Sequence, residues 1–255
     1  MFVNGFITSN NPFLDTEFLP LIESEESYKS NLLRQPFYWE YRNKNIKYKY
    51  NSNGHRSCEI DQLNYDYILF SGCSITEGVG LQEEDCYTHL VAKKLNKQFY
   101  NLGVGGSSPS IAIRNIITFL TKLKNNLPYA IVIQWPHFYR YYSIHGFHHK
   151  HFTPADKTEP LYKALLMDND VFRYNMMERS YLLHFLSILD YKGKLCEIYS
   201  ENQHDWELLV AHDHYCGFTN TFQKTIPGNV DVARDLSHPG SKTNKLYAES
   251  ILDFF

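Results

Sequence analysis

A serine in a glycine-bearing turn is the first residue of this chain whose surroundings point to chemistry. Ser74 lies within Ser71–Gly78 (SGCSITEG), directly after the short apolar run Tyr67–Phe70. At such a turn the hydroxyl is exposed, and the serine's own amide N–H points to the place where an oxyanion would form. The alternative interpretation is a plain strand-to-helix turn in which Gly and Ser act as turn formers.

An Asp–x–x–His pair near the carboxyl end supplies the groups that such a serine needs. Asp235 and His238 stand three residues apart in the segment Asp235–Gly240 (DLSHPG). At this spacing the carboxylate can bond one imidazole nitrogen and fix the tautomer, which leaves the other nitrogen to take a proton from Ser74. The alternative is an aspartate that caps the following helix, beside a surface histidine.

Apolar runs that alternate with amphipathic segments position these residues. Strands are predicted at 67–70, 98–104, 130–135, 195–199 and 206–211, and helices at 83–96, 113–120, 177–190 and 241–254, the last capped by Ser241. The alternation predicts a parallel sheet with helices on both faces and with ligands at the carboxyl ends of its strands. The loops after residues 70, 104 and 135 and the loop before residue 241 are therefore expected at one edge, while 136–172 is predicted to be a loop-like, His-rich insertion.

Residues 1–66 have a different pattern and predict an N-terminal arm, partly a hairpin, packed on a main domain of residues 67–255. Leu19–Ser30 is acidic and weakly helical. Ile46–Tyr50 (IKYKY) alternates as a strand does, and Asn53 and Gly54 follow it as a turn. We call residues 1–66 the arm.

A glycine-rich segment follows the second predicted strand. In Asn101–Ser108 (NLGVGGSS) the glycines allow the backbone to approach a ligand and to offer N–H donors. A dinucleotide or phosphate loop is disfavoured, because Ser108 stands where G-x-G-x-x-G requires glycine and no P-loop lysine is present.

With these three segments in this order, the chain resembles the SGNH (GDSL-type) hydrolase family. The family has a flavodoxin-like α/β fold, and its members hydrolyse carbohydrate acetyl esters, lipids and thioesters. The resemblance spans about residues 67–255 and is confined to short blocks: Gly72–Thr76, Asn101–Gly106 and Asp235–His238. It implies a three-layer α/β/α fold with a parallel central sheet.

The resemblance also assigns roles. It implies Ser74 as nucleophile, His238 as base, Asp235 as its partner, and the amides of Ser74 and Gly106 as oxyanion donors. The chain departs from the family at Cys73, where an aspartate is usual, and after the third strand, where the block that donates an asparagine side chain is absent. Two residues are candidates for that donor, Gln134 and His137.

The expected function is that of a serine esterase acting on a short acyl ester, such as an acetyl ester, of a carbohydrate or another small polar molecule. Trp135, Phe138 and Arg140 directly follow or end the third strand and are candidate substrate-binding residues. Two alternatives stay open: an acyltransferase that uses the same residues, and a non-catalytic binding or assembly module that keeps the fold.

Composition limits the partners. The 255 residues carry a net charge of −3 without a basic cluster, so no nucleic-acid partner is expected. No apolar run reaches the length of a membrane span, and the N-terminus lacks the pattern of a secretory signal. Five scattered cysteines form no C-x-x-C pair, which favours a reducing, cytoplasmic location. No metal or other cofactor is expected, since the histidines at 145, 148, 149 and 151 match no standard zinc spacing.

Overall fold

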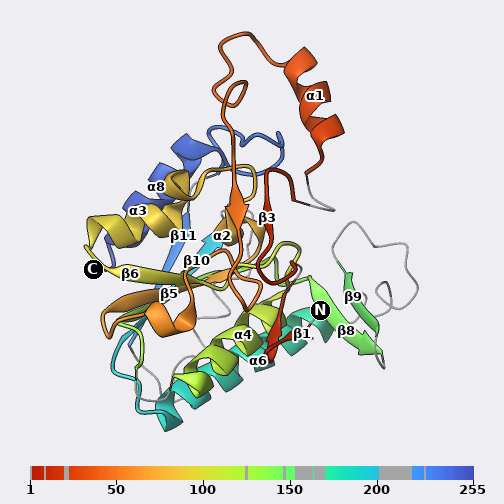
Figure 1. Cartoon of the computed structure of the whole chain (residues 1–255). Coiled ribbons are helices and arrows are strands. Elements are labelled where there is room, and N and C mark those ends of the chain that lie inside the picture. Colours follow the sequence, from red (N-terminus) through yellow and green to blue (C-terminus); the bar gives the residue numbers. More distant parts are fainter. Residues whose placement is uncertain are drawn as a thin grey trace.

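Five parallel strands form the centre of the computed structural model (Figure 1). The strands are β5 (Tyr67–Gly72), β6 (Gln98–Asn101), β7 (Ala130–Gln134), β10 (Lys194–Ser200) and β11 (Thr221–Ile226). Their order across the sheet, β11-β10-β7-β5-β6, is the flavodoxin-like order 2-1-3-4-5 read from the other edge, so the predicted three-layer α/β fold is confirmed. The structure describes residues 2–8, 10–19, 23–123, 126–145, 148–152, 163, 170–200, 220–226 and 228–255.

Helices cover both faces of this sheet (Figure 1). On one face lie α4 (Pro109–Lys122) and α6 (Asp170–Ile188), and on the other α3 (Tyr87–Lys94) and α8 (Ser241–Leu252). Alternate residues of β5 serve the two faces: Leu69 packs in the core under α4 and α6, while Ile68 and Phe70 pack under α3 and α8. A strand buried on both sides needs an unbroken apolar run, which explains the sequences of β5 and β7.

The described part of the arm contains short paired strands and one α-helix. The strand β1 (Phe2–Val3) pairs with β2 (Phe6–Ile7), and β3 (Asp15–Thr16) pairs with β4 (Tyr48–Lys49). The helix α1 (Glu25–Arg34) has a capping box at Ser24, and the short 3₁₀ helix η1 (Ile60–Gln62) precedes β5. Figure 1 shows α1 standing away from the sheet, with β3 and the chain around it reaching back toward the carboxyl ends of the strands.

Three expectations about strands, helices and loops differ from the structure, and a fourth falls outside the described residues. The edge strand is β11, whereas 206–211 lies outside the described residues; β11 has no continuous apolar run because most of its residues are half exposed. The third helix starts at Asp170 instead of residue 177, and part of the expected loop is a hairpin of β8 (Tyr141–His145) and β9 (His148–Phe152). The second expected strand ends at Asn101, not at residue 104.

Ser241 does not cap the last helix. Gly240 is the N-cap residue, and the Ser241 hydroxyl bonds Glu40 instead. The amides of Lys242 and Thr243 donate to the carboxylate of Asp231, at 2.9 and 2.8 Å. The cap therefore comes from a carboxylate in the preceding loop, which suits the positive end of the helix dipole.

A buried ion pair lies under the sheet on the α6 side. Arg179 of α6 bonds both carboxylate oxygens of Glu197, at 2.7 and 2.5 Å, and the indole N–H of Trp135 donates to the same carboxylate at 2.9 Å. The side chains of Arg179 and Glu197 are almost fully buried. Removal of one partner would leave an uncompensated buried charge.

We therefore expect Glu197→Gln to lower the free energy of unfolding by about 3–5 kcal/mol, measured by urea denaturation. The control is Asp66→Asn, which breaks a surface pair with Lys97 in which the carboxylate is largely exposed, and it should change stability by no more than about 1 kcal/mol. Equal effects of the two substitutions would contradict this account of the buried pair.

Candidate active site

Ser74 lies where β5 ends and the short helix α2 (Ser74–Glu77) begins, at the carboxyl edge of the sheet. Gly72 is required here because a Cβ at this position would lie 2.6 Å from the carbonyl oxygen of Gln134 and 2.1 Å from the Thr76 hydroxyl. The helix ends after one turn at Gly78, whose φ of +80° is left-handed. The chain adds β6 on one side of β5 and β7 on the other, so Ser74 sits at the switch point where such sheets bind ligands.

The structure brings Ser74, His238 and Asp235 into one hydrogen-bonded chain. His238 Nε2 lies 2.8 Å from the Ser74 hydroxyl oxygen, and His238 Nδ1 lies 2.5 Å from Asp235 Oδ2. Because an ionised carboxylate only accepts hydrogen bonds, Nδ1 carries the proton and Nε2 is the acceptor for the Ser74 hydroxyl. The imidazole is 19% exposed, whereas Ser74 is only 7% exposed, so the hydroxyl is less open than the sequence predicts and the imidazole is the more open side of the pair.

The loop around Asp235 is built to hold its carboxylate. The other oxygen, Oδ1, accepts the amide hydrogens of Ser237 and His238, at 3.2 and 3.1 Å. Leu236 is left-handed at φ +60°, a strained conformation for leucine that allows the chain to turn this tightly. Burial alone would raise the pKa of Asp235, but the hydrogen bonds and charge of His238 outweigh it and hold that pKa below its ordinary value.

The glycine-rich loop meets the same edge. The Ser107 hydroxyl donates to the carbonyl of Gly72 at 2.9 Å, which ties this loop to the turn that carries Ser74. Gly106 is exposed and left-handed at φ +73°, and a Cβ placed on it would meet no atom within 4 Å. Its conformation therefore suits a backbone N–H that faces an open approach.

Comparison with solved structures identifies this arrangement of strands. A carbohydrate esterase, whose active site is described as displaying "divergent catalytic and non-catalytic binding functions", superposes with a TM-score of 0.52 at 12% identity; the match covers 74% of this chain and 68% of that one. The chain has the SGNH (GDSL-type) hydrolase fold. At this level of identity the likeness concerns the fold alone.

Two further solved structures are also similar to this SGNH fold. The acetyl xylan esterase Est2A from the rumen bacterium Butyrivibrio proteoclasticus gives a TM-score of 0.49 at 14% identity, covering 77% of this chain and 64% of its own. A protein of Desulfitobacterium hafniense described as lipolytic and of the G-D-S-L family gives 0.47 at 12% identity, covering 74% and 99%. No protein-family model and no curated protein matches the sequence.

The two residues that the sequence offers as an additional oxyanion donor, Gln134 and His137, already have partners. The Gln134 side chain is buried; its amide nitrogen donates to the Trp135 carbonyl at 3.2 Å, and its oxygen accepts from the Cys73 thiol at 3.5 Å. His137 is half-buried, and its Nδ1 accepts the amide hydrogen of Tyr139 at 3.3 Å. Cys73, which stands where the SGNH family usually has an aspartate, thus pairs with a glutamine at the base of the turn that carries Ser74.

The three candidate substrate-binding residues fall into two groups. Trp135 and Phe138 are buried and pack together in the core, with ring centroids 5.4 Å apart. Arg140 is half-buried and donates from Nη1 to the carbonyl of Ser107 at 3.3 Å, next to Gly106. In this structure, then, Arg140 is the member of the set that reaches the edge with Ser74.

Glu77, the last residue of α2, was not singled out from the sequence. Its side chain is fully buried, and Oε1 accepts from Asn10 at 2.7 Å and from the Tyr50 hydroxyl at 2.6 Å. Arg56 donates to the backbone carbonyls of Glu77 and Gly78 from the same side. These four contacts tie the arm to the turn that carries Ser74.

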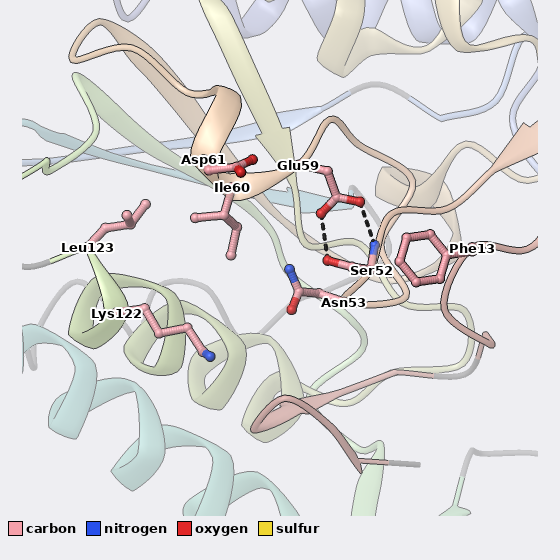
Figure 2. Close-up of a pocket in the computed structure, with 8 residues that line it drawn as sticks. All are labelled: Phe13, Ser52, Asn53, Glu59, Ile60, Asp61, Lys122 and Leu123. Atoms are coloured by element: carbon pink, nitrogen blue, oxygen red, sulfur yellow. Dashed lines mark hydrogen bonds between the residues drawn. The ribbon is translucent and has the colours of Figure 1, made fainter.

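Other features lie apart from the triad. An open pocket of about 680 Å³ is lined by Phe13, Ser52, Asn53, Glu59, Ile60, Asp61, Lys122 and Leu123 (Figure 2). Its residues come from the arm and from the end of α4 remote from Gly106, and the Glu59 carboxylate there accepts hydrogen bonds from the amide and the hydroxyl of Ser52.

Among the residues that the structure describes, no group of three His, Cys, Asp or Glu side chains could hold a metal ion. Within the same residues, no helix is long and apolar enough to cross a bilayer.

Burial raises the pKa of Glu77, although the Tyr50 hydroxyl, the Arg56 charge and Asn10 oppose the shift. A carboxyl whose pKa is higher in the folded chain stabilises the fold below its unfolded pKa of about 4.3 and loses that contribution as the pH rises through the folded value. We therefore expect the free energy of unfolding of the wild type to fall relative to that of Glu77→Gln as the pH rises from about 4 to about 7.

The measurement is urea denaturation of both proteins across that pH range, with the surface variant Glu249→Gln as control. A difference between wild type and Glu77→Gln that moves in the opposite direction would contradict a raised pKa for Glu77.

Proposed function

We propose that the protein is a serine esterase that hydrolyses a short acyl ester, such as an acetyl ester, of a carbohydrate or another small polar molecule. The observation that carries the proposal is the continuous chain of hydrogen bonds from Ser74 through His238 to Asp235. A serine hydroxyl is a weak nucleophile at neutral pH, and an adjacent imidazole held by a carboxylate is what activates it.

In the proposed reaction Ser74 Oγ attacks the ester carbonyl carbon while His238 Nε2 takes the hydroxyl proton. The carbonyl oxygen becomes an oxyanion, for which the amides of Ser74 and Gly106 are the proposed donors. The ester carbon–oxygen bond then breaks as His238 gives its proton to the leaving alcohol, and the acyl group stays on Ser74. Water next attacks the acyl carbon while His238 removes one of its protons; the bond between that carbon and Ser74 Oγ breaks, His238 returns the proton to Ser74 Oγ, and the carboxylic acid leaves. Asp235 keeps the imidazole in one tautomer throughout.

The substrate class rests on two arguments. One similar structure is that of a carbohydrate esterase, which supports an ester of a sugar. Arg140 stands beside the loop of Gly106, and no ion pair joins it to a carboxylate among the described residues. We propose that this guanidinium contacts the substrate, because a half-buried arginine whose Nε has no partner, and which has no carboxylate partner among the described residues, favours a carboxylate or another anion.

An acyltransferase is the second candidate, since a sugar hydroxyl in place of water would use the same Ser74 and His238. The product distinguishes the two activities. An acyltransferase forms an acylated sugar when a sugar is added, whereas an esterase releases the free acid. A non-catalytic module is the third, and it is favoured by the absence of the asparagine donor after β7; Ser74 paired with His238 counts against it.

We expect the wild type to hydrolyse p-nitrophenyl acetate and Ser74→Ala to lose at least about 10⁴-fold in kcat, because the nucleophile itself is removed. Ser187→Ala, which alters an exposed serine near the end of α6, is the matched control and should keep the wild-type rate. Turnover in Ser74→Ala at the wild-type rate, or none in the wild type, would overturn the proposal.

We expect Arg140→Met to reduce kcat/KM for an ester that carries a carboxylate, p-nitrophenyl hemisuccinate, by about 10- to 100-fold, since a charge-assisted hydrogen bond contributes about 1.5–3 kcal/mol. The rate with neutral p-nitrophenyl acetate should change far less. Equal losses with both esters would show that Arg140 supports the loop and does not read the charge of the substrate.

A further inference from the structure

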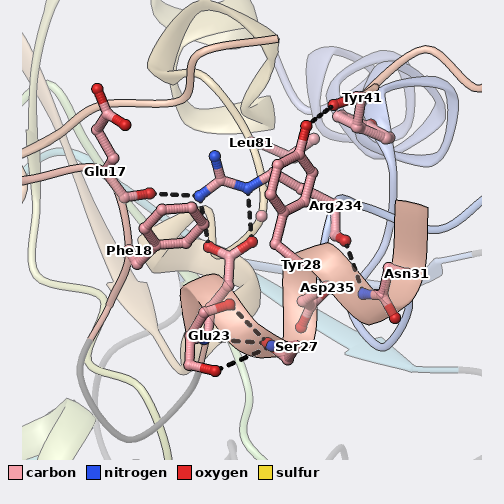
Figure 3. Close-up of polar contacts among 12 residues, drawn as sticks. Glu17, Phe18, Glu23, Ser27, Tyr28, Asn31, Tyr41, Leu81, Arg234 and Asp235 are labelled. Atoms are coloured by element: carbon pink, nitrogen blue, oxygen red, sulfur yellow. Dashed lines mark hydrogen bonds and ion pairs between the residues drawn. The ribbon is translucent and has the colours of Figure 1, made fainter. Parts of the chain in front are cut away.

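The residue before the Asp235 of the triad is tied to the arm by a buried ion pair (Figure 3). Arg234 donates from Nε to Glu23 Oε1 at 2.6 Å and from Nη2 to Oε2 at 2.8 Å, which is a bidentate contact. Nη2 also donates to the carbonyl of Glu17. Both charged side chains are at most 2% exposed, so water does not screen the pair.

Aromatic rings enclose the guanidinium. Its carbon lies 4.7 Å from the ring centroid of Phe18 and 5.4 Å from that of Tyr28, both in the arm. Figure 3 shows Arg234 between these two rings with Glu23 directly opposite its fork. A planar cation held by a fork-to-fork contact and by ring faces has little freedom to shift.

The backbone of the acid loop, residues 231–240, is fixed from the same side. The Asn31 side chain of α1 donates to the Arg234 carbonyl at 3.2 Å, and the Arg234 amide donates to the Gly80 carbonyl at 3.2 Å. Gly80 itself lies against the loop, since a Cβ on it would come within 3.2 Å of Asp235 Oδ1. The segment that follows α2 therefore runs close beside the Asp235 carboxylate, with no room between them for a larger side chain.

Tyr48 closes the network between these two segments. Its hydroxyl donates to Glu23 Oε2 at 2.9 Å and accepts the Gly80 amide hydrogen at 2.7 Å. One carboxylate in the arm thus reaches the loop of Asp235 through Arg234, and the chain just beyond Ser74 through Tyr48. Within the described residues the acid loop has no strand in the central sheet, and its one backbone bridge joins Val232 to Pro239 within itself.

From these contacts we infer that Glu23 is a positioning residue: through Arg234 and Tyr48 it sets the distance between the His238–Asp235 pair and Ser74. The inference rests on the proposed function, because it assigns Glu23 a role in the activity of that site. Displacement of a catalytic group by about 1 Å can reduce a rate about 100-fold, so a side chain that touches no substrate can still control turnover.

The test compares two buried Arg–Glu pairs in the intact chain. Glu23→Gln removes the charge next to the acid loop, and Glu197→Gln removes it from the pair with Arg179 of α6. Unfolding temperature, kcat and KM for p-nitrophenyl acetate are measured well below both unfolding temperatures. We expect both variants to lose stability, but only Glu23→Gln to lose kcat, by about 100-fold with KM within about twofold of the wild type.

Two further variants keep the test decisive. Glu23→Asp retains the charge and should recover part of kcat, while Tyr48→Phe removes only the hydroxyl between Glu23 and Gly80 and should lower kcat even if Glu23→Gln does not fold. Wild-type kcat in folded Glu23→Gln or in Tyr48→Phe, or an equal loss in Glu197→Gln, would overturn the positioning role while the esterase activity stands. A wild type without turnover would instead overturn the proposed function and this inference with it.

Discussion

The hydrogen bond between Ser74 and His238 is the contact on which the rest of the structure depends. It joins two loops that are 164 residues apart in the chain, at 2.8 Å. No strand ladder connects these segments directly among the described residues, since Ser74 follows β5, which lies between β7 and β6, and His238 comes after the opposite edge strand β11. The surrounding contacts must therefore hold the Ser74 hydroxyl and His238 Nε2 within hydrogen-bond distance of each other.

Two buried carboxylates, one in α2 and one in the arm, help to hold these segments in place. Glu77 lies at the end of α2 and is held by Asn10 and Tyr50 of the arm, whereas Glu23 lies in the arm and holds Arg234 of the acid loop. Buried ionic groups are weak sources of stability, because the loss of hydration offsets much of the attraction. We interpret both carboxylates as groups that position Ser74 and the acid loop relative to each other, so that the arm supports the geometry of the site.

The central strands and the edge strand β6 could be predicted from the sequence, whereas the other edge strand, β11, could not. β5 and β7 are buried on both faces and therefore appear as apolar runs, but β11 carries Gln223 and Lys224 and has no such signature. The cap of α8 was assigned to the nearest serine, although the carboxylate that bonds its amides is Asp231. Local patterns identify an element more readily than its boundary or its tertiary partner.

In the candidate site, too, local sequence predicts some residues, while others depend on contacts between distant parts of the chain. Ser74, Asp235 and His238 have recognisable local sequences, and the structure places them together. Trp135 and Phe138 could have lined a pocket or the core, and nothing in their spacing distinguishes these places; the structure puts both in the core. The pair of Glu23 and Arg234 spans 211 residues, so no sequence window contains it.

The most direct test of the central claim is the site of covalent labelling by a fluorophosphonate, located by mass spectrometry of peptides. The account predicts one adduct, on Ser74, formed quickly in the wild type and far more slowly in His238→Ala, because the hydroxyl then lacks its base. An unlabelled Ser74, or labelling of Ser74 at an undiminished rate in His238→Ala, would contradict it.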